Sequence, residues 1–310
     1  MTSLATDSLN RVALIGLGEA GQMLAREFST SGRLQIRAFD IAFADAASAP
    51  STAARTLGIT AASTAAEAVA EAQLVISAVT AGSALDAARS VAAHLPPGAF
   101  FLDINSVAPG TKREAFALVE AGAGRYVEAA VMAPVYPKRL GTPILLGGPH
   151  AGGFLKIAQA LGFNVSVFSE QVGSASAVKM CRSVMVKGLE ALSMECFLAA
   201  RRAGVEAEVI ASLRGSFPDL DWVALGEYNL ERMTTHGIRR SAEMREVAKT
   251  VQELGIAPLM TTAAVEHQAT MGSLRLKDRC GGSLPEGLGA VLDAIGRLDP
   301  WSQAKPKAAG

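Results

Sequence analysis

The first half of the chain alternates between two patterns of hydrophobic residues. Short apolar runs bounded by glycine, proline or acidic residues are typical of buried strands, and the alanine-rich segments between them have the spacing of amphipathic helices. The predicted strands are residues 11–16, 34–40, 74–78, 100–103, 126–130, 143–147 and 164–168. The predicted helices are residues 22–29, 64–70, 83–94 and 152–161. Strands that alternate with helices predict a doubly wound parallel sheet in an α/β domain.

The second half of the chain shows no strand pattern beyond about residue 170. Residues 174–203 form a periodic apolar stretch without proline, which predicts one unusually long helix. Further helices are predicted at residues 205–215, 219–234, 239–254, 258–276 and 285–297. We therefore expect an α/β domain at residues 1–169 and an all-α domain at residues 170–310, with a disordered tail at residues 302–310.

Composition and charge exclude several classes of partner. The chain has 29 Lys and Arg and 29 Asp and Glu, so it offers no basic field that would attract nucleic acid or an anionic membrane. Its three cysteines lack metal-ligand spacing, so we expect reduced thiols and no metal site. The sequence shows neither a signal peptide nor a membrane span, which favours a cytoplasmic location.

A glycine-rich turn lies between the first predicted strand and the first predicted helix. Residues 16–21 fit the pattern G-x-G-x-x-G in the strand–turn–helix context that the pattern requires. Gly16 permits the tight turn, Gly18 lets the backbone approach a pyrophosphate, and Gly21 allows the helix to pack closely on the strand. The other cofactor-binding residues expected in this turn are Leu17, Glu19 and Ala20. The turn predicts a Rossmann-type domain that binds a dinucleotide.

An acidic residue indicates which dinucleotide binds. Asp40 stands at the end of the second strand, nineteen residues after Gly21. It can accept hydrogen bonds from ribose hydroxyls and would repel a 2′-phosphate, and residues 41–43 supply no arginine to reverse this preference. NAD is therefore favoured over NADP, although Asp40 could instead cap a turn. We expect Ala78 and Val79, at the end of the third predicted strand, to line the same cofactor site.

Two loops carry further motifs: residues 103–109 read D-I-N-S-V-A-P, and residues 128–134 read E-A-A-V-M-A-P. They resemble loops of the 3-hydroxyacid dehydrogenase superfamily, which includes 3-hydroxyisobutyrate and 6-phosphogluconate dehydrogenases. The superfamily's substrate loop D-x-S-[ST]-x-x-P corresponds to residues 103–109, where Asn105 replaces the first serine and Ser106 is kept. Its second loop, D-A-P-V-S-G-G, corresponds to residues 128–134, where Met132 replaces the serine. The frame of both loops is present, but the Ser-Gly-Gly that would bind a substrate carboxylate is absent.

A third motif, at the start of the long predicted helix, is similar to the superfamily's G-x-x-G-x-G-x-x-x-K-x-x-x-N. Lys179 stands where the superfamily has its catalytic lysine, and Ser183 stands where it has asparagine, one helical turn further on the same face. The resemblance implies that Lys179 is the general acid/base of hydride transfer, with Asn105, Ser106 and Ser183 beside the substrate. The alternative interpretation is a surface lysine in a salt bridge.

The chain is further similar to a subgroup of phosphogluconate-dehydrogenase-like proteins whose C-terminal helical domain has no known function. The residues that carry this resemblance lie at 103–106, 179–182, 187–190 and 236–244. His236, Arg239 and Arg240 begin a predicted helix and could bind an anionic substrate group, in their own site or in that of a partner subunit. The alternative is local pairing of Arg239 with Glu243. The long apolar helix and the many helices after it suggest a homodimer.

These motifs together predict an NAD-dependent oxidoreductase that transfers hydride between the nicotinamide and a small hydroxyacid-like or related alcohol substrate. One alternative is reduction of an imine or ketone by NAD(P)H, for which Lys179 would be dispensable. Another alternative is a non-catalytic cofactor-binding protein, which the altered loop positions motivate.

Overall fold

The computed structural model describes residues 9–30 and 32–301, so the tail predicted at residues 302–310 lies outside the described residues. The chain divides into two compact units, Met1–Met180 and Cys181–Gly310, and each is described by itself. The division falls within helix α7 (Ser174–Ala203), later than the expected boundary after residue 169, because the first turns of this helix belong to the first unit.

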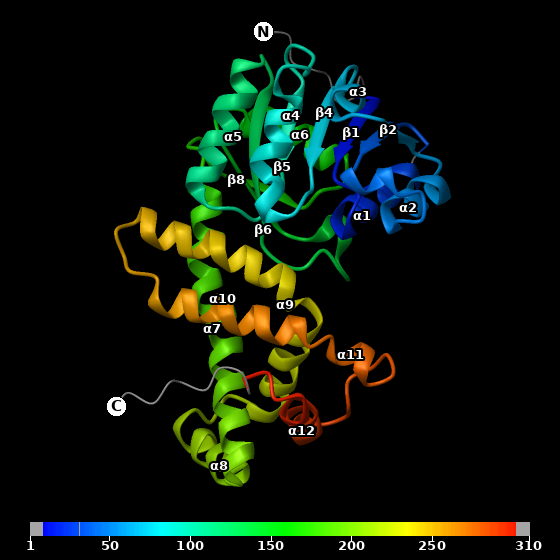
Figure 1. The fold of residues 1–310 in the computed structure, drawn as a ribbon. Helices are drawn as coiled ribbons and strands as arrows, with labels where there is room; N and C mark the ends of the chain where they lie inside the picture. Colours follow the sequence, from blue (N-terminus) through cyan, green and yellow to red (C-terminus); the bar gives the residue numbers. More distant parts are fainter. Residues whose placement is uncertain (1–8, 31, 302–310) are drawn as a thin grey trace, which may run out of the picture. The chain divides into compact units, whose positions relative to one another are not determined.

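The described part of the first unit contains an eight-stranded sheet with the order β3-β2-β1-β4-β5-β6-β7-β8 (Figure 1). Its strands are β1 (Arg11–Ile15), β2 (Gln35–Phe39), β3 (Thr60–Ala61), β4 (Leu74–Ser77), β5 (Phe100–Asp103), β6 (Arg125–Val131), β7 (Ile144–Gly147) and β8 (Val165–Ser169). Neighbouring strands run parallel from β3 to β6 and again from β7 to β8, whereas β6 and β7 pair antiparallel. The predicted Rossmann-type parallel sheet is confirmed, with its last two strands reversed.

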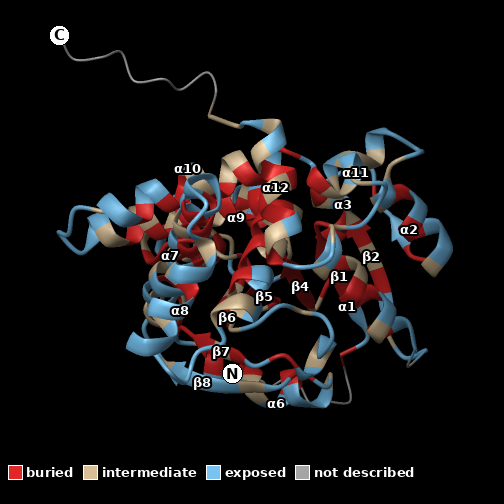
Figure 2. Cartoon of the chain, turned by 90° about the horizontal axis from the view of Figure 1, so that it is seen from below, coloured by how far each residue is buried: buried red, intermediate tan, exposed pale blue. Residues whose placement is uncertain are grey.

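Helices cover both faces of this sheet, as the doubly wound prediction requires. They are α1 (Glu19–Thr30), α2 (Ala49–Leu57), α3 (Ala65–Val69), α4 (Ala84–Ala92), α5 (Pro109–Ala121) and α6 (Ala151–Ala160), with short 3₁₀ turns η2 (Ile41–Ala44), η3 (Ala81–Ser83) and η4 (Arg139–Gly141). Alternate residues of β1 face opposite sides: Leu14 packs in a core with α1, α2 and α6, and Ile15 packs in a core with α3, α4 and α5. Figure 2 shows the central strands as buried, whereas most of edge strand β8 is exposed.

The hydrophobic pattern missed two helices of this unit, α2 and α5. Both begin with proline at the first or second helical position, where the missing N–H costs nothing. Ser48 caps α2 through its side chain, which accepts a hydrogen bond from the backbone of Ser51. These terminal signals, rather than apolar periodicity, mark the two helices in the sequence.

The described part of the second unit is all-α, as predicted. After α7 it contains α8 (Glu206–Ser216), α9 (Trp222–Glu253), α10 (Leu259–Ser273), α11 (Leu276–Arg279) and α12 (Leu288–Leu298). The prediction of separate helices at 219–234 and 239–254 is wrong, since α9 runs through both without a break. Within residues 9–30 and 32–301, the helices are all too short or too polar to cross a membrane.

Glycines explain why α9 continues where the sequence suggested an interruption. A Cβ added to Gly237 would lie 2.2 Å from the backbone oxygen of Gln268, and one added to Gly272 would lie 2.4 Å from the nitrogen of Ile238. The backbones of α9 and α10 therefore touch at this point, which only glycine permits. Gly237 is a packing residue in a helix and does not end one.

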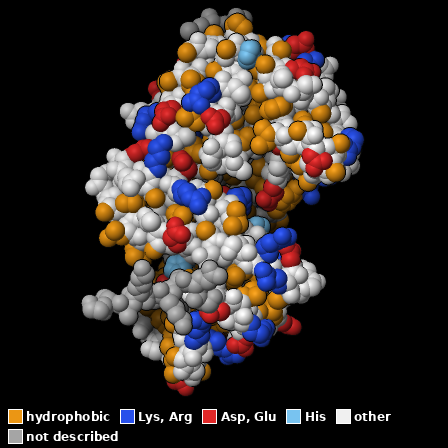
Figure 3. All heavy atoms as spheres, in the orientation of Figure 1, with side chains coloured by type: hydrophobic (Ala, Val, Ile, Leu, Met, Phe, Trp, Pro, Cys, Tyr) orange, Lys and Arg blue, Asp and Glu red, His pale blue; other side chains and the backbone are white. Residues whose placement is uncertain are grey.

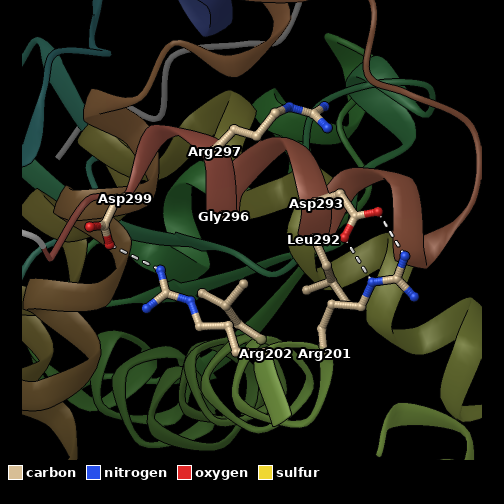
Figure 4. Close-up of a pocket in the computed structure, with 8 residues that line it drawn as sticks. Arg201, Arg202, Leu292, Asp293, Gly296, Arg297 and Asp299 are labelled. Carbon is tan, nitrogen blue, oxygen red and sulfur yellow. Dashed lines mark hydrogen bonds and ion pairs between the residues drawn. The ribbon is translucent and has the colours of Figure 1, made fainter. Parts of the chain in front are cut away.

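The end of α7 is tied to α12 by ion pairs. Arg201 donates two hydrogen bonds to Asp293, at 2.8 and 2.7 Å, and Arg202 donates one to Asp299 at 3.1 Å (Figure 4). These pairs border an open surface cavity of about 550 Å³. Because Arg201 and Arg202 are paired with carboxylates of α12, they serve to hold this helix in place.

We predict that Gly237→Ala destabilises the protein, whereas Gly153→Ala in α6 does not. The first change forces two helix backbones apart, at an expected cost of about 1–3 kcal/mol or more. A Cβ on Gly153 meets no heavy atom of the described residues within 4 Å. This control should gain roughly 0.5–1 kcal/mol from better helix propensity. Thermal unfolding of both variants checks the pair, and equal Tm values would contradict the described crossing.

Candidate functional site

The turn between β1 and α1 has the geometry that its glycines predicted. Gly16 has φ +94°, and its N–H donates to the oxygen of Phe39 at 2.9 Å. A Cβ on Gly16 would lie 2.5 Å from the oxygen of Ala78, and a Cβ on Gly21 would lie 2.2 Å from the oxygen of Gly16. These two glycines are required by contacts of the protein with itself.

Gly18 differs from its two neighbours in the motif. A Cβ built there would meet no heavy atom of the described chain within 4 Å, and the residue is exposed. Helix α1 begins directly afterwards, so the N–H groups of its first turn, including Glu19 and Ala20, lack partners within the helix and can receive an anion. Leu17 is fully buried, its N–H donates to Asp40, and its oxygen accepts from Gln22, so it holds the shape of the turn. The space beside Gly18 therefore fits a dinucleotide pyrophosphate.

Asp40 joins the end of β2 to this turn. One carboxylate oxygen accepts from the N–H of Leu17 at 2.7 Å, and the other accepts from the N–H of Ala42 at 2.9 Å and caps η2. The turn-capping role that was the alternative for Asp40 is thus present. An ionised carboxylate accepts about four hydrogen bonds, so it retains capacity for ribose hydroxyls.

Asn105 lies in a buried network at the ends of β4 and β5. Its Oδ1 accepts from the N–H of Val79 at 2.8 Å, and its Nδ2 donates to Ser77 Oγ at 2.9 Å and to Asp103 Oδ1 at 2.8 Å. The residue is 5% exposed. The Asn105 amide thus binds the Val79 loop through its oxygen and the ends of β4 and β5 through its nitrogen.

Sequence reasoning missed two members of the same network. Lys112 Nζ donates to the backbone oxygen of Asp103 at 2.8 Å and lies 3.0 Å from its Oδ1, while the Tyr126 hydroxyl donates to Oδ2 at 2.8 Å. Burial, followed by the charge of Asp103, raises the pKa of the Tyr126 phenol well above its usual value. A buried lysine has no sequence signal that separates it from a surface lysine, so the residue pattern could not reveal Lys112.

The structure brings Lys179 and Ser106 together, as the motifs predicted. Lys179 Nζ donates to Ser106 Oγ at 2.5 Å, and both residues are half-buried. Ser106 belongs to the loop after β5, and Lys179 lies in the second turn of α7. Ser183 lies one turn further along the helix, in the second unit.

Parallel strands gather the site residues at one edge of the sheet. The turn at Gly16 follows the carboxyl end of β1, and the loop at Val79 follows that of β4. The loop at Ser106 follows the carboxyl end of β5, and Met132 follows that of β6. Half-buried Met132 donates its N–H to the oxygen of Pro143 at 2.9 Å. Doubly wound sheets bind their ligands at this edge. Among the described residues, no cluster of His, Cys, Asp and Glu is suited to hold a metal ion.

The predicted anion-binding residues of the second unit are placed differently. His236, Arg239 and Arg240 lie within α9, so the prediction that they begin a helix is wrong. Arg239 forms the local pair with Glu243, at 2.7 Å, that was the alternative interpretation. Arg240 is 5% exposed and donates to both carboxylate oxygens of Glu190.

A second buried ion pair lies beside Arg240 in this unit. Lys187 Nζ lies 2.7 Å from Glu243 Oε2, and Gln268 donates to Glu190 at 2.7 Å. Burial lowers the pKa of the Lys187 ammonium, although Glu243 opposes this shift. The cations of this cluster are bound to carboxylates of their own unit.

The comparison with known families agrees with this two-part architecture. Residues 11–166 match the family described as the NAD binding domain of 6-phosphogluconate dehydrogenase. Residues 200–271 match a family described as a domain of unknown function (DUF1932). The first match covers the glycine turn and the sheet as far as the start of β8. The second covers α8, α9 and most of α10.

Two solved structures are similar to this chain in both sequence and fold. A conserved hypothetical protein from Sinorhizobium meliloti is 37% identical, over 93% of this chain and 96% of that chain, with a TM-score of 0.72. The conserved protein MTH1747, described as structurally similar to 3-hydroxyacid dehydrogenases, is 33% identical over 88% of this chain and 99% of that chain, with a TM-score of 0.65.

A more distant structure shares the fold alone. The 3-hydroxyisobutyrate dehydrogenase of Mycobacterium tuberculosis, solved with L-serine, is 17% identical over 94% of this chain and 99% of that chain, with a TM-score of 0.67. The glycine turn, the doubly wound sheet and the family match agree with one another. The chain therefore belongs to the family that carries the NAD binding domain of 6-phosphogluconate dehydrogenase, here joined to a DUF1932 domain, and it has the fold of the 3-hydroxyacid dehydrogenases.

Proposed function

We propose that the protein is an NAD-dependent oxidoreductase that transfers hydride between the nicotinamide and a hydroxyacid-like or related alcohol. The observation that carries this proposal is the hydrogen bond from Lys179 to Ser106, at the carboxyl edge of the sheet that also presents the glycine turn. An amine of this kind in a dinucleotide-binding fold supplies the proton transfer that accompanies hydride transfer.

Lys179 is the general acid/base in this mechanism. A nicotinamide held at this edge of the sheet would supply or accept the hydride. The neutral amine of Lys179 removes the hydroxyl proton when the alcohol is oxidised, and the ammonium returns it in the reverse reaction. Ser106 Oγ orients the Lys179 side chain and can hydrogen-bond the same substrate oxygen. Asn105 keeps the neighbouring Val79 loop in place.

Cofactor choice is assigned to Asp40. A carboxylate beside the turn favours the ribose hydroxyls of NAD and repels the 2′-phosphate of NADP. The segment Ile41–Ala44 contains no lysine or arginine that would bind this phosphate. The proposed cofactor is therefore NAD.

The substrate class follows from the loop after β6. Met132 occupies the place where 3-hydroxy carboxylates meet serine in the superfamily, and Ser183 occupies that of asparagine. A bulkier or less acidic alcohol, or a polyol acid, suits these residues better than a short 3-hydroxy acid. The balanced charge of the chain favours a small molecule over nucleic acid or a membrane as partner.

We also propose a homodimer, because the second unit exposes two apolar surfaces. One lies on α7 and consists of Met185, Leu189 and Leu192. The other lies at the connected ends of α9 and α10, where hydrophobic side chains gather in Figure 3, and consists of Leu254, Ile256, Leu259 and Met260. In a two-fold dimer the α7 surface of each subunit can cover the α9–α10 surface of the other. Each subunit then buries both surfaces, which adds to the roughly 800 Å² per partner that stable interfaces bury.

Replacement of Lys179 tests the proposed mechanism. Lys179→Ala is expected to lower kcat by about 10²–10⁴-fold on a substrate found in a panel of hydroxy acids and alcohols, because it removes the proton acceptor. Lys156→Ala, at an exposed lysine of α6, is the control and should leave kcat unchanged. NADH absorbance measures both.

Other results of that experiment would favour one of the two alternative functions. Full activity of Lys179→Ala would contradict the acid/base role and favour reduction of an imine or ketone. Binding of NADH without turnover of any compound in the panel would favour a non-catalytic cofactor-binding protein.

Gly18→Ala tests the placement of the cofactor. The protein has room for this Cβ, but the Cβ would collide with a bound pyrophosphate. The affinity for NADH should therefore fall about tenfold or more, while the Tm of the free protein is unchanged. Gly153→Ala in α6 is the control, since its Cβ also meets no described heavy atom within 4 Å. Calorimetric titration with NADH measures both variants, and unchanged affinity in Gly18→Ala would place the cofactor elsewhere.

Substitution at the ends of α9 and α10 tests the dimer. The double variant Leu259→Glu and Met260→Glu should be a monomer, because burial of two carboxylates against an apolar partner is unfavourable. Phe168→Glu, at an exposed apolar residue of β8, is the control and should leave the dimer intact. Light scattering after gel filtration gives the mass, and a monomeric parent protein would overturn the proposal.

A further inference from the structure

Glu128 is a buried carboxylate that the mechanism above does not use. It lies in the middle of β6, is 0% exposed, and faces Asp103 of β5 and Gly147 of β7 in the strand register. A Cβ on Gly147 would lie 2.6 Å from Glu128 Oε2. Strand β7 therefore leaves room for the Glu128 carboxylate only because residue 147 is glycine.

The two oxygens of Glu128 bind the start of helix α7. Oε2 accepts from the N–H of Gly173 and Oε1 accepts from the N–H of Ser176, each at 2.6 Å. Gly173 has φ +96°, which turns its N–H toward the carboxylate. Negative charge at a helix N-terminus is stabilising, and here it comes from a strand rather than from the helix itself.

The same first turn of α7 is attached to the loop that carries Ser106. Ser176 Oγ donates a short hydrogen bond to the backbone oxygen of Val107. Lys179 follows Ser176 by three residues, which places both side chains on one face of the helix, and it bonds Ser106. The adjacent loop residues Ser106 and Val107 thus accept hydrogen bonds from side chains in two successive turns of α7.

Burial raises the pKa of the Glu128 carboxyl above its usual value, and the charge of Asp103 adds to this shift. The Lys112 ammonium and the two backbone N–H groups oppose it. A glutamine at this position would keep the size but offer one acceptor oxygen, and would direct an NH₂ group at one of the two N–H groups.

We propose that Glu128 is a positioning residue for Lys179: its carboxylate fixes the first turn of α7, and Ser176 then holds that turn at the distance from which Lys179 reaches Ser106. This inference rests on the proposed function of Lys179. The contacts that carry it all lie within the first unit.

The test compares the chemical reactivity of Lys179 in the parent, Glu128→Gln and Ser176→Ala. Trace labelling with acetic anhydride, read by mass spectrometry, gives the labelling rate of Lys179 relative to exposed Lys156. In both variants this ratio should change about threefold or more, since the start of the helix opens more often. On a substrate, kcat should fall about tenfold with unchanged affinity for NADH, because a misplaced base slows only the chemical step.

Glu120→Gln is the matched control. Glu120 also accepts a backbone N–H of β6, that of Tyr126 at 2.9 Å, but it lies outside the site. This variant should keep the parent labelling ratio. A parent-like ratio in both Glu128→Gln and Ser176→Ala would overturn the proposal, and Ser176→Ala alone decides if Glu128→Gln does not fold. A changed ratio together with full activity of Lys179→Ala would retain the positioning role and reject the acid/base chemistry.

Discussion

The buried carboxylate of Asp103 constrains the surroundings of the site more than any other group. An ionised carboxylate leaves water only where charged and polar partners replace its hydration. Here Lys112 comes from α5, Tyr126 from β6 and Asn105 from the following loop. Because Asn105 also accepts from the N–H of Val79, this network joins the loops after β4 and β5 to each other and to α5 and β6. These two loops are thereby attached to one buried polar network.

Glu128, on the neighbouring strand, is a second buried carboxylate with polar partners. It lies beside Asp103 in register and binds the start of α7, so the helix that carries Lys179 is attached to the sheet through a second buried carboxylate. Breaking such a pair by removal of one partner is costly, because the remaining group stays buried without compensation. The proposed proton-transfer residue is therefore held by rigid elements, although its partner Ser106 lies on a loop.

Much of the fold was predictable because its signals are local. All strands except the two-residue β3, and helix α7, follow from apolar periodicity. The turn at Gly16 follows from a spacing with one geometric meaning. Contacts between distant segments gave no such signal. Gly237 suggested a break, yet it permits a helix crossing that depends on Gly272, far along the chain. Lys112 looks like a surface cation in the sequence, and Arg240 was predicted to bind a substrate anion. The burial of both side chains becomes visible only once their carboxylate partners are placed.

The central claim is that the glycine turn binds a nicotinamide dinucleotide and that Asp40 selects NAD. Thermal unfolding of the parent protein with NAD, NADH, NADP and NADPH tests this most directly, since a ligand that binds only the native state raises the Tm by mass action. The account predicts clear stabilisation by NAD or NADH and less by either phosphorylated form. Absence of a shift with all four nucleotides would contradict it, and stabilisation by NADP or NADPH alone would reject the role of Asp40.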